Sequence, residues 1–389
     1  MAEFPGAIIL GNEYQALGLL RQLARSGIPC VLLDQDAWGV ARFSRYRCRF
    51  HRAPRYASDE FWPWLVRLAH EQGYLGWLPV ATDDEQVRHF AQHYEEACAL
   101  FRYAGLPWAS YQHIYNKRLA YPWAQSLGAP VPRTFMPEHR EHLPGEGWPF
   151  PAIIKPAVKR EYGRYTRRKA IRVETRAELQ QVLNGLLAPV PIEHLMVQEL
   201  IPGDGSTQWS YAGFFVEGRP VAAYTACRRR QHPPDFGRAS TYVVAMPNEE
   251  VEAQSRRLLG ALGYTGLAEV EWKRDARDGQ LKFLEINARC WGWHTLSEPV
   301  VGNLPKMLYD YLIYQSVQPV SPRYGFRWVK WVTDVPVAIE LMRRGELAWR
   351  DYWASIRGSS AYGDWDAQDP LPFLLQFALV PYLLKTRGY

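Results

Sequence analysis

The stretch FLEINAR, Phe283 to Arg289, decides how this chain is interpreted. Strand side chains alternate between two faces, so the stretch predicts a β-strand with two different sides. One side is apolar and carries Leu284, Ile286 and Ala288. The other carries Phe283, Glu285, Asn287 and Arg289. An acid, an amide and a guanidinium on one side of a strand otherwise suited to burial indicate a binding surface.

The segment before this strand predicts its hairpin partner. Asp278-Gly279 is a typical hairpin turn, and a turn there brings Glu271 close to a position opposite Glu285. Like charges placed opposite each other destabilise a sheet, and a polyvalent cation would turn that repulsion into binding. Mg²⁺ prefers a few hard oxygen ligands plus substrate phosphates, and Asn287 offers a further carbonyl oxygen. The same spacing also fits the solvated outer face of an ordinary hairpin.

Length and composition favour a globular protein with anionic partners. The 389 residues suffice for two or three packed units, and 47% hydrophobic with 22% charged residues is an ordinary balance. The net charge of +6, without a long basic tail, favours a phosphate-bearing small molecule over nucleic acid. The five cysteines are scattered singly and the first residues lack a secretory pattern, which favours a reducing cytoplasm over zinc or disulfides.

The N-terminal segment predicts a βαβ unit. A short apolar run at Ala7 to Leu10, a helical pattern and a second apolar run at Cys30 to Leu33 indicate a parallel sheet covered by helices. LPVATDDEQVRHFAQ repeats strand then helix, with Thr82 or Asp83 as N-cap. An NAD-dependent oxidoreductase is disfavoured, because the GxGxxG fingerprint is absent.

The last stretch, from about residue 316, is rich in Trp and punctuated by Pro. Its final apolar run, PLPFLLQFALVPYLL, is too short to cross a bilayer and is broken by Pro381. Two interpretations stay open. The first, which we favour, is a terminal helix docked on the protein. The second is an interfacial membrane helix with Lys385 and Arg387 at the lipid headgroups.

Five motifs occur in a characteristic order: NK, FPAIIKP, VQELIPG, EVEWKRD and FLEINAR. As a set they resemble the ATP-grasp ligases, and among these the carboxylate–amine ligases related to D-aspartate ligase. The resemblance runs to about residue 315. It implies a mixed α/β and α+β architecture: a Rossmann-like preATP-grasp domain (1–113), a small lobe (114–195), a central lobe with the metal site (196–315) and a partly amphipathic C-terminal extension (316–389).

The resemblance also implies roles for single residues. The lysines that contact ATP phosphates match Lys117 and Lys155. The slot for adenine and ribose matches Gln198, Glu199, Leu200 and Ile201. The magnesium ligands match Glu271, Glu285 and Asn287. Arg289 matches the residue that orients the transferred phosphate or the substrate carboxylate.

Two basic segments depart from the family pattern. VKREYGRYTRRKAIRV has one glycine, Gly163, where many members have a glycine-rich loop, and its six basic side chains from Lys159 to Lys169 fit a phosphate or substrate clamp as well as a solvated run. In CRRRQHPPDFGRAST, one arginine of 228–230 would take the γ-phosphate position. We choose Arg229 for that role and Arg238 for the substrate carboxylate. WGWH (Trp291 to His294) would wall the acceptor pocket or pack in the core, with His294 as a speculative general base.

The combined prediction is an ADP-forming ligase that uses ATP and Mg²⁺. It would activate a small-molecule or conjugated carboxylate as an acylphosphate and join it to an amine. The alternatives are another carboxylate-activating ATP-grasp enzyme and a non-catalytic ATP-binding protein. We expect a cytoplasmic protein without a nucleic-acid partner, with peripheral contact at the inner membrane face as the second interpretation of its C-terminal helix. The sequence identifies neither the two substrates nor the oligomeric state.

Overall fold

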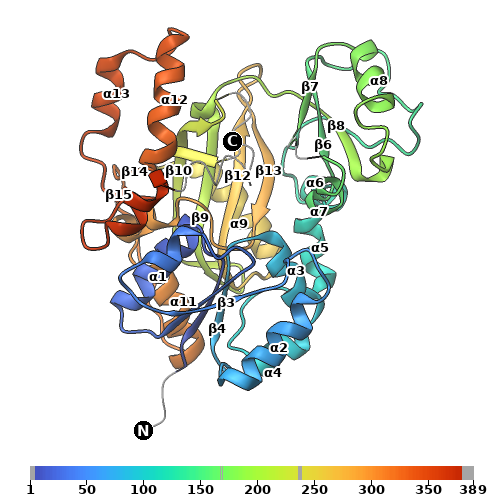
Figure 1. The fold of residues 1–389 in the computed structure, drawn as a ribbon. Coiled ribbons are helices and arrows are strands. Elements are labelled where there is room, and N and C mark those ends of the chain that lie inside the picture. The colour runs from blue at the N-terminus through green and yellow to red at the C-terminus, as the bar shows by residue number, and fades with distance from the viewer. Residues whose placement is uncertain (1–4, 167, 169, 235–238, 379–389) are drawn as a thin grey trace.

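The computed structural model describes residues 5–166, 168, 170–234 and 239–378 (Figure 1). Its strands form three sheets. In Figure 1 the N-terminal unit lies below the largest sheet, the small lobe lies at its upper right and helices α12 and α13 lie at its upper left.

The N-terminal unit confirms the predicted parallel sheet. Its strand order is β3-β2-β1-β4, and all neighbours are parallel. The strands are β1 (Ala7–Leu10), β2 (Cys30–Asp34), β3 (Arg49–Arg52) and β4 (Leu78–Ala81). The helices are α1 (Tyr14–Arg25), α2 (Phe61–Gln72), α3 (Asp84–Gln92) and α4 (Tyr94–Leu100). Asp83 is the N-cap of α3 and forms a capping box with Gln86, which closes the turn that follows β4.

The small lobe is an antiparallel sheet of order β5-β8-β6-β7. Its strands are β5 (Thr134–Phe135), β6 (Ala152–Pro156), β7 (Ile171–Val173) and β8 (Leu195–Glu199). The helices of this region are α5 (Trp108–Tyr115), α6 (Lys117–Ser126), α7 (Lys159–Gly163) and α8 (Arg176–Asn184). Strand β8 pairs within this sheet, so the lobe extends to Glu199, a few residues past the boundary expected after residue 195.

The third sheet has seven strands in the order β13-β12-β9-β10-β11-β14-β15. They are β9 (Gln208–Val216), β10 (Arg219–His232), β11 (Ala239–Ala245), β12 (Gly266–Arg274), β13 (Leu281–Asn287), β14 (Arg327–Val329) and β15 (Ala361–Tyr362). The helices are α9 (Glu249–Leu262), α10 (Ser297–Val300), α11 (Leu304–Tyr314), α12 (Trp331–Arg343) and α13 (Trp349–Ile356). Since β14 and β15 continue this sheet, the C-terminal extension is built onto the central lobe.

Packing joins the N-terminal unit to the large sheet but leaves the small lobe with its own core. One buried cluster contains Leu17 and Leu20 of α1, Phe214 of β9, Trp293 and Leu308 of α11. The core of the small lobe is a separate cluster, which includes Ile154, Leu179 and Leu183. Met196 of β8 packs instead in the core of the large sheet, so the small lobe has its own core and one apolar contact with its neighbour.

A β-bulge changes the predicted faces of FLEINAR. Glu271 pairs with Glu285, but the next pair is Trp272 with Phe283, so Leu284 is the extra residue. Phe283 therefore packs in the same core cluster as Ile286, while Leu284 is half-buried outside that cluster. The prediction that Phe283 shares a face with Glu285 is wrong for this reason.

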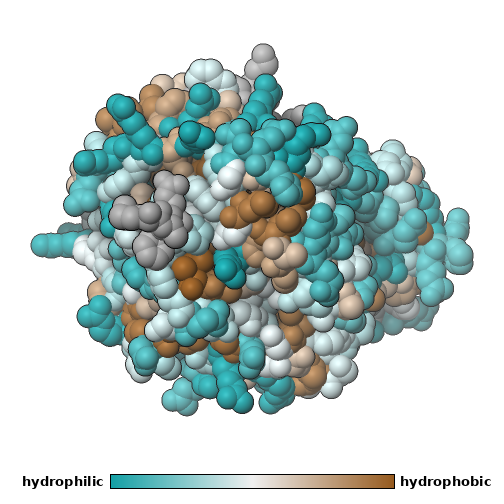
Figure 2. Space-filling model, turned by 90° about the horizontal axis from the view of Figure 1, so that it is seen from below, coloured by the Kyte–Doolittle hydropathy of each residue, from teal (hydrophilic) through white to brown (hydrophobic). Residues whose placement is uncertain are grey.

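One face of the molecule shows how its apolar atoms are distributed. Seen from the side of the N-terminal unit, it is mostly hydrophilic, and apolar atoms form small separate patches (Figure 2). Within the part of the chain that the structure describes, no helix is long and apolar enough to cross a bilayer.

Candidate functional site

The two glutamates of the predicted metal site face each other across a hairpin. Glu271 of β12 and Glu285 of β13 are directly opposite partners, as the turn at Asp278-Gly279 predicted. Asn287 lies one same-face position further along β13, and its Nδ2 donates to Glu271 Oε1 at 2.9 Å. The sheet thus holds all three predicted ligands in one polar cluster, which we call the acidic cluster.

Two cations stand against this cluster. Lys117 Nζ lies 2.7 Å from Glu285 Oε2, and Arg228 Nη2 lies 3.2 Å from Glu271 Oε2. Lys117 is the first residue of α6, which is capped by the Asn116 side chain. Burial alone would lower the pKa of Lys117, but the Glu285 carboxylate outweighs it and raises that pKa. Lys117 is therefore cationic at any physiological pH.

Lys155 lies at the end of β6, close enough to Lys117 for the two positive charges to repel each other. Its Nζ donates to Gln198 Oε1 at 3.0 Å, and Gln198 Nε2 donates to Thr134 Oγ1 at 2.9 Å. Burial, helped by the charge of Lys117, lowers the pKa of Lys155 from 10.5 to about 8. An anionic ligand at this position would restore the charged form.

Arg289 connects the acidic cluster to the N-terminal unit. Its Nε lies 2.6 Å from Asp84 Oδ1, on the first turn of α3, and its Nη2 donates to Asn287 Oδ1 at 2.9 Å. Asp84 outweighs the effect of burial and raises the pKa of Arg289. The guanidinium is thus a fixed positive charge beside the ligand side chains, as expected for a group that holds an anion.

Glu269 is a member of the acidic cluster that was not predicted from the sequence. It is 3% exposed, and its carboxylate accepts from Ser210 Oγ (2.9 Å), Trp293 Nε1 (3.1 Å) and Asn287 Nδ2 (3.1 Å). Burial and the neighbouring Glu271 raise its pKa from 4.5 to about 8. The signal was present, because Glu269 and Glu271 are two residues apart on one strand and so share a face.

The arginine chosen from residues 228–230 is not the one that the structure brings to the cluster. Arg228 contacts Glu271, whereas Arg229 contacts Met246 Sδ at 3.3 Å and Arg230 forms a buried pair with Asp334 at 2.8 Å. The geometry therefore favours Arg228 over Arg229 for the phosphate. Arg238 lies outside the described residues.

The predicted adenine slot follows the end of β8. The backbone N–H groups of Glu199 and Leu200 donate to Arg133 O and Pro151 O, and Ile201 is 5% exposed. The Glu199 carboxylate accepts from Arg133 N, Lys282 Nζ and Arg277 Nη2. Burial opposes this charge, but these hydrogen bonds outweigh it and lower the pKa of Glu199. Glu199 thus ties the small lobe to the β12–β13 hairpin, and its nucleotide role stays a prediction.

The basic loop contributes a contact between units. Arg160 of α7 lies 3.4 Å from Asp59 and 3.9 Å from Glu85, both in the N-terminal unit. These two acids explain the position of Arg160 without a bound phosphate, and Arg160 is one of the six basic side chains of the loop.

The WGWH motif belongs to the core. Trp291, Trp293 and His294 are all at most 3% exposed, and the two indole rings meet at 5.5 Å. His294 Nδ1 bonds Trp291 O, and its Nε2 faces Gly18, where an added Cβ would lie 2.8 Å away. Burial lowers the pKa of His294 to about 4. The motif therefore packs in the core, which is the second of its two interpretations, and the role of His294 as a general base stays a prediction.

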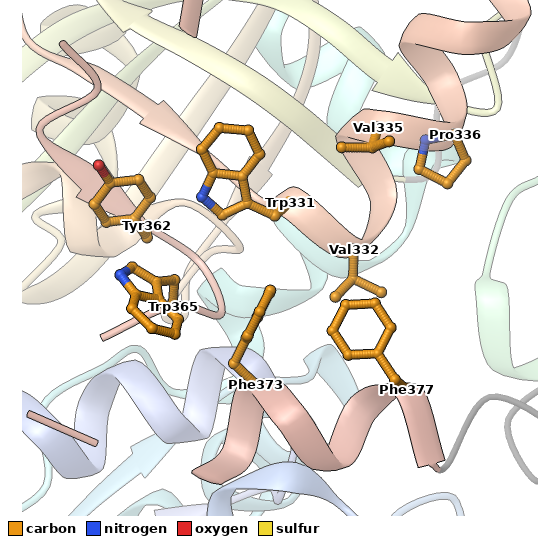
Figure 3. Close-up of a pocket in the computed structure, with 8 residues that line it drawn as sticks. All are labelled: Trp331, Val332, Val335, Pro336, Tyr362, Trp365, Phe373 and Phe377. Carbon is orange, nitrogen blue, oxygen red and sulfur yellow. The ribbon is translucent and has the colours of Figure 1, made fainter. Parts of the chain in front are cut away.

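The C-terminal extension contains a cavity, and no residue of the acidic cluster lines it (Figure 3). Its volume is about 570 Å³, and its lining is apolar. Figure 3 shows Phe373 and Phe377 directed from helix 371–378 toward Trp331 and Val332 of α12. Helix 371–378 is docked through Pro372 and Gln376, as favoured from the sequence, while Leu371, Leu374 and Phe377 are 51–57% exposed.

The acidic cluster fits magnesium by its chemistry. Glu271, Glu285 and Asn287 offer two carboxylates and a carbonyl oxygen, which suits an ion that keeps phosphate and water ligands. Among the described residues, no group of three or more His, Cys, Asp or Glu side chains could hold a metal ion by itself. In the structure the Asn287 nitrogen faces Glu271 and its oxygen faces Arg289, so ligation through that oxygen requires the amide to turn.

Comparisons with known proteins bear on the fold and on the kind of enzyme that the chain resembles. No family model matches the chain. A D-aspartate ligase of Enterococcus faecium is 27% identical over 300 residues, which cover 72% of this chain and 70% of that protein. The L-amino acid ligase from Bacillus licheniformis superimposes with a TM-score of 0.59 at 16% identity, covering 82% of this chain and 75% of that one.

Carboxylases share the fold as well. The biotin carboxylase domain of the Hydrogenobacter thermophilus 2-oxoglutarate carboxylase, solved with MgADP, ADP and bicarbonate, has a TM-score of 0.63 at 14% identity over 84% of this chain and 74% of that one. Rhizobium etli pyruvate carboxylase has a TM-score of 0.62 at 18% identity over 83% of this chain, which spans 29% of that larger protein.

Proposed function

We propose that this chain, which shares the fold of the ATP-grasp ligases, is an ATP-dependent carboxylate–amine ligase and that the acidic cluster between β12 and β13 is its catalytic centre. The observation that supports this most is the opposed pair Glu271 and Glu285, each held by a cation from another part of the chain. Such an arrangement places hard oxygen ligands and phosphate-binding cations within one site.

The cations would bind the triphosphate of ATP. Lys117, Lys155 and Arg228 reach the site from α6, β6 and β10, so they surround the acidic cluster. When phosphate oxygens arrive, these side chains can exchange a carboxylate or amide partner for the nucleotide. The positive charges of Lys117 and Arg228, and that of Lys155 once phosphate restores it, would stabilise the γ-phosphoryl group during transfer.

Glu271, Glu285 and Asn287 would hold Mg²⁺. When bound, the ion supplies further neutralisation of phosphate charge. The backbone at Gln198–Ile201, where the small lobe ends, is proposed to receive adenine. This location would place the base beside the small lobe and the phosphates beside the large sheet.

The chemistry then follows from positioning. Arg289 would hold the substrate carboxylate, whose oxygen attacks the γ-phosphorus of ATP, so that ADP leaves and an acylphosphate forms. The nitrogen of an amine attacks the acyl carbon, the C–O bond to phosphate breaks, and an amide and inorganic phosphate result. No nucleophilic side chain is needed, because the acylphosphate already carries a good leaving group. The protein would supply orientation and exclusion of water.

The test is ADP and phosphate release from Mg-ATP with pooled carboxylates and pooled amines. Release that requires both pools supports the ligase. Release with carboxylate alone would indicate another carboxylate-activating ATP-grasp reaction or hydrolysis of the acylphosphate. Binding of Mg-ATP without turnover by any pool would favour a non-catalytic ATP-binding protein.

Glu285→Gln is the variant that links turnover to the acidic cluster. The change preserves shape but removes a metal ligand and the partner of Lys117, so we expect kcat to fall by roughly 10²- to 10³-fold. The carboxylate is one-third exposed, so the unfolding midpoint should shift by only a few degrees. Glu250→Gln, an acid-to-amide change at an exposed pair with Arg274, is the matched control. Unfolding of the Glu285 variant would show that this residue is structural.

A further inference from the structure

Each acid of the acidic cluster except Glu269 has a cationic partner. Glu285 pairs with Lys117 and Glu271 with Arg228. Within the described ranges of the chain, no basic side chain lies within 4.0 Å of the Glu269 carboxylate, and its three donors are the neutral groups of Ser210, Trp293 and Asn287. A buried carboxylate without a counter-charge is costly, so this position favours a cation supplied from outside the chain.

The strand register places Glu269 at the substrate end of the cluster. Glu269 is opposite Asn287, whereas Glu271 is opposite Glu285, so Glu269 lies further from the phosphate-binding Lys117 and closer to Arg289. One amide connects the two charged groups, since Asn287 donates to Glu269 and accepts from Arg289. A carboxylate and a guanidinium therefore stand on either side of Asn287.

An ammonium group beside Glu269 would favour its ionised form, and the resulting carboxylate together with Arg289 matches a ligand that carries both charges. An amino acid presents a carboxylate and an ammonium group separated by one to a few carbon atoms. Arg289 would hold the carboxylate, and Glu269 is placed to accept from the ammonium. Trp293 Nε1 and Ser210 Oγ both donate to Oε1, which fixes the orientation of the acid.

We propose that Glu269 is a specificity-determining residue that binds the ammonium group of an amino-acid substrate whose carboxylate is activated. The inference rests on the proposed function, because it takes Arg289 as the carboxylate ligand. Under this proposal, Glu269 is the residue that makes the enzyme prefer amino acids over carboxylic acids that lack an amino group.

The experiment compares amino acids with the same acids lacking the amino group. D-Aspartate is paired with succinate. Both enantiomers of glutamate are paired with glutarate, and both enantiomers of alanine are paired with propionate. ADP formation is measured with Mg-ATP and pooled amines, in the wild type, Glu269→Gln, Glu269→Asp and Glu252→Gln. Glu252 is paired with Arg256 on the outside of α9 and serves as the matched acid-to-amide control.

The wild type should prefer the amino acid in at least one pair by roughly 10- to 100-fold in kcat/KM, the range of a charge-assisted hydrogen bond. Glu269→Gln should bring that ratio close to one, mainly through a higher KM for the amino acid. Glu269→Asp should keep part of the preference, and Glu252→Gln all of it. Stabilisation of Glu269→Gln by Mg-ATP, measured as a thermal shift, verifies that its fold and nucleotide site are intact.

Two results overturn the proposal while the proposed function stands. One is a wild type that uses carboxylates without preferring those with an ammonium group. The other is a folded Glu269→Gln variant that keeps the wild-type preference. A wild type that forms no ADP with any pair would overturn the proposed function as well.

Discussion

Lys155 is the residue whose charge depends most on whether a ligand is present. Its pKa of about 8 means that the free protein loses this charge above pH 8, whereas phosphate oxygens would raise the pKa again. Binding of ATP above pH 8 should therefore take up a proton. ATP affinity should be constant below pH 8 and fall by up to about tenfold per pH unit above it, until the pKa of the bound state is reached.

Calorimetry in two buffers of different ionisation enthalpy measures this proton uptake directly. Lys155→Arg keeps a permanent charge and should remove the uptake, while Lys155→Met should remove both uptake and tight binding. ATP affinity that is independent of pH from 7 to 10 in the wild type would show that Lys155 does not contact the phosphates.

Strand alternation predicted some residues of the acidic cluster correctly, but it could not predict the residues that register shifts displace. Glu271, Glu285 and Asn287 were found because a turn and strand alternation place them together. Arg229 was chosen over Arg228 because alternation cannot locate the register shift in β10 between Arg228 and Arg230. The bulge at Leu284 had the same effect on β13, since one inserted residue reverses the faces without any change in composition.

At the scale of elements, helix 371–378 is docked by one face and exposed by the other. Pro372 and Gln376 are buried, while Leu371, Leu374 and Phe377 form an exposed apolar stripe next to the C-terminal cavity. Contact with a membrane surface stays a prediction, and it has a direct test. It is the second interpretation of the sequence, and its basic residues Lys385 and Arg387 lie outside the described residues. Under that interpretation, vesicles containing anionic lipid would retain the protein in co-sedimentation, and Leu374→Glu would reduce the bound fraction several-fold; docking alone predicts no retention.

Leu75→Glu is the matched control for this vesicle assay. Leu75 is an exposed leucine (42%) of the N-terminal unit, so its replacement should leave vesicle binding unchanged. Equal sedimentation of the wild type and the Leu374 variant would show that the stripe does not contact lipid.

The buried pair Arg21 and Asp369 ties the C-terminal extension to the N-terminal unit. Arg21 Nε lies 2.9 Å from Asp369 Oδ2, and Ser44 Oγ also donates to that oxygen at 2.7 Å. Asp369→Ala would leave the buried Arg21 charge with only the more distant Asp366 carboxylate, at 4.0 Å, so the free energy of unfolding should fall by about 3 kcal/mol. Urea unfolding measures the loss, and the double variant Arg21→Met, Asp369→Leu should recover much of it. A loss below about 1 kcal/mol in the single variant would contradict this expectation.

For the whole molecule, the N-terminal parallel sheet was predictable because the apolar runs of β1 and β2 flank the long, periodic helix α1. The placement of the C-terminal extension was not. Its strands β14 and β15 have three and two residues, too few for a period to be seen, and the Arg21–Asp369 pair joins residues 348 positions apart. Such long-range contacts leave no local trace in a sequence, so the extension could be delimited but not positioned.

The separate core of the small lobe predicts a local response to nucleotide. Most of its buried apolar residues form a cluster of their own, although Met196 of β8 packs in the core of the large sheet. Polar contacts such as Glu199–Lys282 and Arg160–Asp59 also join it to the other units. Amides of β6, β7 and α8 should therefore exchange with deuterium faster than those of the large sheet.

A non-hydrolysable ATP analogue with Mg²⁺ should slow exchange most strongly at β6 and β8, because ligand binding there closes the small lobe on the hairpin. Hydrogen-exchange mass spectrometry measures both effects, with Glu285→Gln expected to show weaker protection at the same analogue concentration. Protection spread evenly over all three sheets would mean that the small lobe and the large sheet open as one unit, which would contradict this prediction.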